Sequence, residues 1–226
     1  MITLAIESST KVASVTIAKD QNILETRSSD NPKTHSEFIN SAVQDLLNGH
    51  ELDFKSLNRI CVSLGPGSFT GIRVGLAIAK TLSYLLKIPI FAVDSLSCLA
   101  ENDQKANSII LPTLNAQKNL IYWAAYERDL SGNIEKKELI APQCTSIQDV
   151  LAFIRKQTKV LRLTGDGINL IKKCLENKED KPDFLESHAD ANPKSEILSQ
   201  VGILWAKNVQ PIDWKLIEPL YIRSSQ

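Results

Sequence analysis

Alternating apolar and polar positions at the start of the chain predict a small antiparallel sheet. The alternation runs over residues 2–6 and again over residues 13–17, with the period of two that is typical of strands with one buried face. A further apolar run over residues 23–27 is followed by the polar, turn-forming stretch 28–32, which cannot easily continue a strand. We therefore expect the chain to begin with three antiparallel strands.

The next apolar patterns have helical spacing. Thr34 and Glu37 have the spacing of a capping box, in which each side chain accepts a hydrogen bond from the other residue's amide. Behind them, apolar residues recur one, three and four positions apart and predict a helix with one apolar face. Those residues are Phe38, Ile39, Ala42, Val43, Leu46 and Leu47. The next elements have the order of a parallel crossover: a strand over 59–64, a glycine-rich loop, a helix over 72–86 and a strand over 88–93.

The second half of the chain repeats this order. The predicted elements are strands over 109–114, 120–126 and 134–140, a helix opened by the capping box Ser146 with Asp149, a strand over 160–164, a helix ending near 174 and a last helix over 192–208. The sequence therefore predicts an internally duplicated α/β protein. We expect an amino-terminal domain over residues 1–104 and a smaller carboxy-terminal domain over 105–226, divided in a polar stretch.

Composition narrows the functional classes. Apolar residues make up 43% of the chain and charged residues 23%, which excludes collagen-like and disordered proteins. The 26 basic side chains balance 26 acidic ones, so no global field favours nucleic acid or anionic lipid. No apolar run reaches the roughly 20 residues that span a bilayer, and the four cysteines form no C-x-x-C pair. We expect a cytoplasmic protein with no membrane segment.

Three stretches carry a resemblance to a known family. They are Ala5, Ile6, Glu7, Ser8, Ser9, Thr10; then His35, Ser36, Glu37; and the string Gly65, Pro66, Gly67, Ser68, Phe69, Thr70, Gly71, Ile72, Arg73, Val74, Gly75, Leu76. On these motifs the chain resembles the bacterial TsaB family, also called YeaZ. Weaker similarity at 165–167 and 219–223 extends the resemblance over nearly the whole chain. Where many relatives carry Asp-Ala-Arg, this chain has Asn115, Ala116 and Gln117.

The resemblance implies an actin-like, hexokinase-like ATPase fold of two duplicated ribonuclease-H-like subdomains with mixed sheets. It also implies a non-catalytic partner of TsaD, which with TsaE transfers the threonylcarbamoyl group from threonylcarbamoyl-adenylate to N6 of adenosine 37 in tRNAs that read ANN codons. The protein would contact tRNA only through the complex, need no cofactor and form a homodimer when alone. The alternatives are a small-molecule kinase or ATPase of the same fold and, less favoured, a glycoprotease-like peptidase.

The resemblance implies that the two helices of the first half form the interface with TsaD or with a second copy. Gly71, Gly75 and Ala79 fall at every fourth position, so one strip of the second helix is nearly bare. Each interior glycine costs about 0.5–1 kcal/mol relative to alanine, so the strip needs a packing reason. A partner helix is favoured over a helix of the same domain. The expected interface residues are His35, Phe38, Ile39, Ala42, Gly71, Ile72, Gly75, Leu76 and Ala79.

The loops are interpreted as turns and not as nucleotide sites. The glycine-rich loop, Gly65, Pro66, Gly67, Ser68, Phe69 and Thr70, lacks the Gly-Lys-Ser/Thr of a P-loop, and we expect a tight turn with Ser68 or Thr70 as helix cap. Glu7, Ser8, Ser9 and Thr10 lie where ATPases of the implied fold hold phosphate and magnesium, but they include no glycine, which indicates a degenerate site. Gly165, Asp166 and Gly167 are a remnant of an adenosine loop or, preferably, an ordinary turn.

No pattern in the sequence indicates metal binding or nucleophilic catalysis. The histidines are His35, His50 and His188, and none belongs to an H-E-x-x-H motif. No G-x-S-x-G nucleophile elbow is present, because Ser68 directly follows Gly67. We therefore expect neither a metal site nor catalytic residues.

Overall fold

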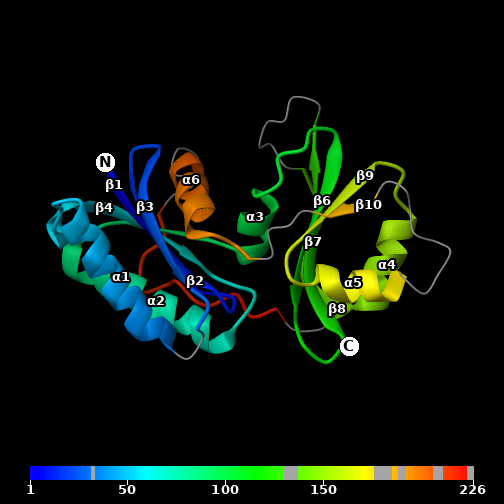
Figure 1. The fold of residues 1–226 in the computed structure, drawn as a ribbon, viewed down its shortest axis with the longest axis horizontal. Coiled ribbons are helices and arrows are strands. Elements are labelled where there is room, and N and C mark those ends of the chain that lie inside the picture. Colours follow the sequence, from blue (N-terminus) through cyan, green and yellow to red (C-terminus); the bar gives the residue numbers. More distant parts are fainter. Residues whose placement is uncertain (32–33, 130–136, 176–184, 188–191, 206–210, 223–226) are drawn as a thin grey trace. The chain divides into compact units, whose positions relative to one another are not determined.

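Backbone contacts divide the computed structural model of the protein into two units, each with its own sheet (Figure 1). The first comprises Met1–Cys98 and Pro193–Leu220, and the second Leu99–Asn192 and Tyr221–Gln226. The structure describes all residues except 32–33, 130–136, 176–184, 188–191, 206–210 and 223–226. The expected boundary after residue 104 lies near the first change of unit. The sequence does not predict the later return of Pro193–Leu220 to the first unit.

A mixed sheet with the strand order β3-β2-β1-β4-β5 forms the first unit. β1, β2 and β3 pair antiparallel, whereas β4 runs parallel to β1 and β5 parallel to β4. The strands are β1 Ile2–Glu7, β2 Ala13–Lys19, β3 Asn22–Ser29, β4 Leu57–Ser63 and β5 Ile90–Val93. The helices are α1 His35–Gly49, the 3-10 helix η2 Phe54–Ser56, α2 Phe69–Leu86 and α6 Ser195–Trp205, and the short helix α3 Ser95–Ala100 crosses the boundary after Cys98. The predicted order of strand, helix and parallel strand is confirmed.

Helices cover both faces of this sheet. Leu4 and Ile6 of β1 belong to the core under α1 and α2, whereas Ala5 packs with Cys61 in the core under α6. Figure 1 shows α1 and α2 side by side on one face and α6 on the other. Alternate side chains of β1 therefore pack against helices on opposite faces of the sheet, and the strand is buried on both faces.

The second unit repeats the topology of the first. Its strand order is β10-β9-β6-β7-β8. As in the first unit, three strands pair antiparallel (β8, β7 and β6), and two more, β9 and β10, run parallel to β6. The strands are β6 Ser108–Asn115, β7 Leu120–Arg128, β8 Lys137–Ser146, β9 Val160–Thr164 and β10 Leu185–Ser187. The helices are α4 Ile147–Arg155 and α5 Ile168–Leu175. The predicted duplicated α/β fold with mixed sheets is thus confirmed.

Local signals at the helix starts predict some caps correctly and one incorrectly. The capping box of Ser146 and Asp149 is present at α4. The box at α1 is wrong, because Thr34 makes no side-chain cap bond and its hydroxyl donates to Asn31 O at 3.3 Å. The sequence also gives no signal for the three-residue strand β10, which is too short for a recognisable alternation.

Hydroxyl groups and a glycine dock α6 on the first sheet. Thr16 Oγ1 and Ser195 Oγ lie 2.7 Å apart, and Ser195 N donates to Ser14 Oγ at 3.0 Å. Further along α6, a Cβ on Gly202 would lie 2.2 Å from Cys61 Sγ. Burial raises the pKa of this thiol to about 12, so Cys61 stays protonated and serves as a packing residue.

Adding one methyl group at Gly202 should destabilise the protein. We expect Gly202→Ala to cost about 1–3 kcal/mol, the usual penalty for overpacking, and to lower Tm by several degrees in differential scanning calorimetry. Cys61→Ala in the same chain removes the colliding sulfur and should make the two effects non-additive. Gly49→Ala is the matched control, because its new Cβ would meet only Glu25 Oε2, at 3.9 Å. An unchanged Tm for Gly202→Ala would contradict this account of the α6 contact.

Candidate functional site

The glycine-rich loop is a tight turn that leads from β4 into α2. Gly65 and Gly67 have φ values of +92° and +152°, which side chains other than glycine rarely adopt. Ser68 caps the helix, since its hydroxyl accepts a hydrogen bond from Gly71 N at 3.2 Å. The helix therefore starts at Phe69, one turn before the apolar pattern indicates. The expected turn and the Ser68 cap are confirmed.

The turn between β1 and β2 lies directly against the start of α2. Ser68 N donates to Ser9 O at 2.6 Å, and Ser8 Oγ donates to Gly71 O at 2.9 Å. A Cβ on Gly67 would lie 2.0 Å from Ser9 O. Groups of the same chain thus occupy the Ser68 and Gly71 amides, which an anion at this helix start would need.

The strip of small residues on α2 has its packing reason inside the chain. A Cβ on Gly71 would lie 2.1 Å from Ser8 O, and one on Gly75 would lie 2.3 Å from Ser8 Oγ. Ala79 on the same strip is fully buried. The glycines therefore admit the β1–β2 turn of their own unit, and the expectation that they receive a partner helix is corrected.

Glu7, at the end of β1, is a buried carboxyl group that is held by its own turn. Its Oε1 accepts from Ser9 N at 2.7 Å and from Ser63 Oγ at 2.9 Å, whereas its Oε2 has no partner among the described residues. Burial raises the pKa of Glu7 and outweighs these hydrogen bonds, which lower it. Thr10 Oγ1 accepts from Val12 N at 3.3 Å. The Ser9 amide is thus engaged by Glu7 Oε1 and does not point to a phosphate, whereas Glu7 Oε2 has no hydrogen-bond partner among the described residues.

The corresponding loop of the second unit is also a turn. Gly165 has φ +100°, and a Cβ there would lie 2.0 Å from Thr113 O. Asp166 Oδ1 accepts from Asn115 N at 2.8 Å, and Asn115 Oδ1 accepts from Gln117 N at 2.8 Å. Asp166 and Asn115 therefore stabilise two neighbouring turns by hydrogen bonds. The sequence around Asn115 does not predict this role. Gly167 completes this contact, since its Cβ would lie 2.8 Å from Thr113 Cβ.

Most expected interface residues on α1 and α2 lie in the core and not on the surface. Five of them are almost fully buried: Ile39, Ala42, Ile72, Leu76 and Ala79. His35 is also buried, and its Nε2 lies 3.1 Å from Lys11 O. Phe38 is half-buried against the same core. These side chains position the two helices, and any partner must meet the opposite faces.

The outward face of α2 differs in chemistry from that of α1. The exposed positions of α1 are polar, with the exception of Gly49: Ser36, Glu37, Asn40, Ser41, Gln44, Asp45 and Asn48. α2 instead exposes four apolar or aromatic residues, Phe69, Ala77, Tyr84 and Leu85, beside Thr70, Arg73 and Thr81, and its charged residues, Arg73 and Lys80, are basic. The Arg73 guanidinium lies 3.7 Å from the centre of the Phe69 ring. Only a third of α2 is buried. By length and composition alone the helix could span a membrane, but the core helices of soluble proteins meet the same criteria.

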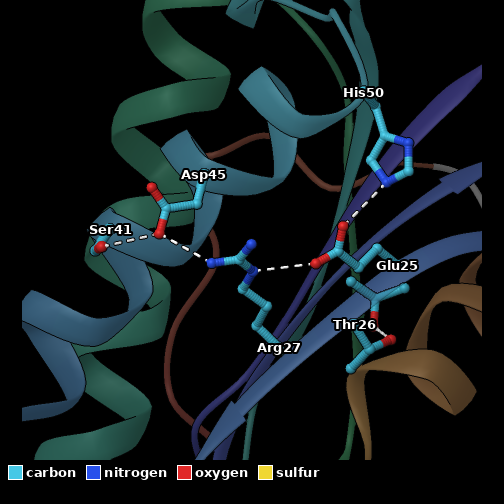
Figure 2. Close-up of polar contacts among 7 residues, drawn as sticks. Glu25, Thr26, Arg27, Ser41, Asp45 and His50 are labelled. Carbon is cyan, nitrogen blue, oxygen red and sulfur yellow. Dashed lines mark hydrogen bonds and ion pairs between the residues drawn. The ribbon is translucent and has the colours of Figure 1, made fainter.

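A polar network joins α1 to the edge strand β3 (Figure 2). Arg27 lies 3.1 Å from Glu25 Oε1 and 3.0 Å from Asp45 Oδ2, and Glu25 Oε2 lies 3.2 Å from His50 Nε2. These groups are partly exposed, and exposed pairs contribute at most about 1 kcal/mol each. The network fixes the outer side of α1 and protects the sheet edge with charge. Among the described residues no three His, Cys, Asp or Glu side chains form a metal-binding group, and His188 lies outside them.

Enlarging Gly75 should unfold the isolated protein instead of only blocking a partner. We expect Gly75→Leu to lower Tm at every protein concentration, because the new side chain collides with Ser8. Ala77→Leu, two residues away on the exposed side, should leave Tm within about 2 °C of the parent. Thermal melts of the two variants measure the difference. If the Gly75→Leu protein folds with an unchanged Tm but no longer binds its partner, the glycine strip faces a partner helix after all.

The buried carboxyl of Glu7 should make stability depend on pH. Because its pKa is raised on folding, the unfolded chain loses its proton first as pH rises from the ordinary value of about 4.3. The free energy of unfolding should therefore fall with rising pH in the wild type relative to Glu7→Gln, over the range between the two pKa values. Urea unfolding at several pH values measures this slope. Glu218→Gln, at an exposed site, is the control, and parallel wild-type and Glu7→Gln curves would contradict the assignment.

Comparisons with known proteins identify relatives of this chain. A family model described as TsaD, tRNA N6-adenosine threonylcarbamoyltransferase, matches residues 26–191. The TsaB protein of Bacillus subtilis is 28% identical over 226 residues, covering 100% of this chain and 96% of that protein. The TsaB protein of Buchnera aphidicola subsp. Schizaphis graminum is 35% identical over 176 residues, covering 76% and 81%. Both are named tRNA threonylcarbamoyladenosine biosynthesis proteins.

Solved structures share the fold. YeaZ from Pseudomonas aeruginosa superposes with a TM-score of 0.78 at 22% identity, covering 97% of this chain and 100% of that one. A ROK family protein from Streptococcus pneumoniae superposes with a TM-score of 0.50 at 13% identity, covering 93% and 100%. These likenesses confirm the predicted relation to the ATPase fold. The family model and the relatives together show that the chain belongs to the TsaB family.

Proposed function

We propose that this protein is an accessory subunit in the biosynthesis of threonylcarbamoyladenosine in tRNA, and that it supports a TsaD-type transferase without performing the transfer itself. Its relatives from Bacillus and Buchnera carry the name of this pathway, and the matching family model carries the name of the transferase. The protein would work in the cytoplasm, meet TsaE in the assembled complex and reach tRNA only through its partners.

The outward face of α2 is the observation that carries this proposal. Two thirds of a long apolar helix lies unburied, with Phe69, Tyr84 and Leu85 each more than half exposed. Exposed large apolar side chains on one helix favour a protein–protein interface, because their burial stabilises an association at about 25 cal/mol per Å². We place the transferase on this face. When the partner is absent, a second copy of the chain covers it.

The geometry of the loops supports an accessory role. In the first unit, Ser9 N donates to Glu7 and Ser68 N donates to Ser9 O. In the second unit, Asp166 accepts from Asn115 N, and Gly165 lies against Thr113. The backbone amides of Ser9, Ser68 and Asn115, which a nucleotide-using enzyme would direct at its ligand, thus donate hydrogen bonds within the chain. The transferase named by the family model would be the partner that supplies the reactive centre.

Reconstitution tests the division of labour between the two subunits. The purified chain should neither hydrolyse ATP nor modify tRNA. It should restore tRNA modification when TsaD, TsaE and threonylcarbamoyl-adenylate are supplied, measured by mass spectrometry of digested nucleosides. ATP turnover by the chain alone would favour the kinase alternative, and modified tRNA made by TsaD and TsaE without this chain would overturn the accessory role.

A single carboxylate on α2 should prevent assembly. We expect Ala77→Glu to weaken binding to TsaD by about 30-fold or more, the effect of losing about 2 kcal/mol at an interface centre, and to abolish tRNA modification with it. Ala152→Glu is the matched control, because Ala152 is exposed on α4 of the second unit. Sedimentation velocity measures the complex, and circular dichroism checks that both variants fold. If the two variants bind TsaD equally well, the interface does not lie on α2.

A further inference from the structure

Residues 101–107, which we name the linker, connect α3 to β6 at the start of the second unit. Segments between units are ordinarily exposed, polar and flexible. This linker is polar, but two of its side chains are buried, since Glu101 is only 4% exposed and Asp103 only 2%. Its far end is bonded next to the end of β7, because Asn107 N donates to Asp129 O at 2.9 Å. The linker is therefore packed against the second unit.

Each buried carboxylate of the linker is paired with an arginine of the second sheet. Arg128 on β7 donates from Nη2 to Glu101 Oε2 at 2.8 Å. Arg162 on β9 donates from Nε to Asp103 Oδ2 at 2.6 Å. Arg128 is 1% exposed and also donates to the Ala100 carbonyl at 3.3 Å, so this pair reaches back to the end of α3. Two ion pairs thus join the linker to two different strands.

The two arginines lie on the same face of the second sheet. Arg128 is paired with Ser108 of β6, and Arg162 is paired with Ile110, two residues further along the same strand. Residues two apart in a strand share a face, and the residue between them points to the other face. That intervening residue, Ile109, belongs to the core under α4 and α5. The ion pairs therefore attach the linker to the face of the sheet opposite these helices.

Burial makes each ion pair a strict geometric constraint. Taking a charged group out of water is costly, and the attraction between the two charges offsets this cost only while they stay together. The Nε and Nη1 atoms of Arg128 are buried and have no hydrogen-bond partner among the described residues. If the linker moved away, Arg128 would also lose the Glu101 carboxylate that compensates its charge. Asp103 is held at a second point, since its Oδ1 accepts from Lys105 N at 3.1 Å.

We infer that the pairs Glu101–Arg128 and Asp103–Arg162 form a clasp that holds the linker rigid on the second sheet, so that the linker does not serve as a flexible hinge. Removing one partner of a buried pair is strongly unfavourable, whereas an exposed pair contributes little. Any flexible joint between the units then lies outside the linker. The inference is independent of the proposed function, because every contact that carries it lies within the second unit.

Hydrogen exchange at single amides of the full chain, measured by NMR, tests the clasp. In the wild type, the Lys105 and Asn107 amides should exchange at least about 100-fold more slowly than in an unstructured peptide of the same sequence, as amides in ordered segments do. Glu101→Gln and Asp103→Asn keep the side-chain shape but remove one charge, and each should speed this exchange about 10-fold or more.

The neighbouring ion pair of Glu127 and Lys159 provides a matched control. Glu127 is adjacent to Arg128 on β7, but the pair is partly exposed, with 23% of the Glu127 side chain and 47% of the Lys159 side chain accessible. Glu127→Gln removes the same kind of charge from the same region of the sheet. It should leave the exchange of the linker amides unchanged, because exposed pairs contribute little.

Each outcome decides for or against the clasp. If the linker amides of the wild type exchange as fast as in the unstructured peptide, the linker is a hinge and the inference is overturned. If they are protected and both charge-removing variants leave that protection unchanged, backbone hydrogen bonds hold the linker and the clasp is also overturned. If Glu101→Gln speeds exchange equally at Leu161 and Leu163 in β9, the whole unit has unfolded, and Asp103→Asn, at the less buried pair, then decides.

Discussion

The close contact between the β1–β2 turn and the start of α2 determines which side of this helix is buried in the first unit. Ser8 and Ser9 approach α2 so closely that glycine is required at 67, 71 and 75. The Ser9 carbonyl and the Ser8 hydroxyl bond to the loop and to the first turn of α2. One side of α2 is thereby joined to the strand that carries Glu7, and Phe69, Tyr84 and Leu85 elsewhere on the helix are exposed.

This contact also explains why one set of residues suggests two functions. In a nucleotide-using enzyme, a turn after the first strand and a glycine-rich helix start would leave their amides open to an anion. Here the same elements lie close enough to bond to one another, and Glu7 is buried beneath them with a raised pKa. The chain retains the architecture of the ATPase fold, while these backbone amides and hydroxyl groups bond to one another within the first unit.

The sequence predicts the fold well because the fold depends on local patterns. Strand alternation, helical spacing and the Ser68 and Ser146 caps each involve residues within a few positions of one another, and the structure has them. The role of Gly71 and Gly75 could not be predicted in this way. Their contact residue, Ser8, lies more than sixty positions away, so the sequence indicates that a close approach exists without indicating what approaches. The contact between Tyr84 and Trp214 could not be predicted for the same reason, because the two residues are 130 positions apart in the sequence.

The placement of α6 has a consequence for biosynthesis of the protein. The first unit is built from two separate stretches of chain, and the cores around Ala5 and Ile217 require residues from the second stretch. A nascent polypeptide that has released only Met1–Cys98 from the ribosome cannot bury that side of its sheet. The second unit, contiguous over Leu99–Asn192 except for the last residues of the chain, can begin to fold earlier. The core of the first unit can therefore close only after residues 193–220 have been synthesised, later than most of the second unit.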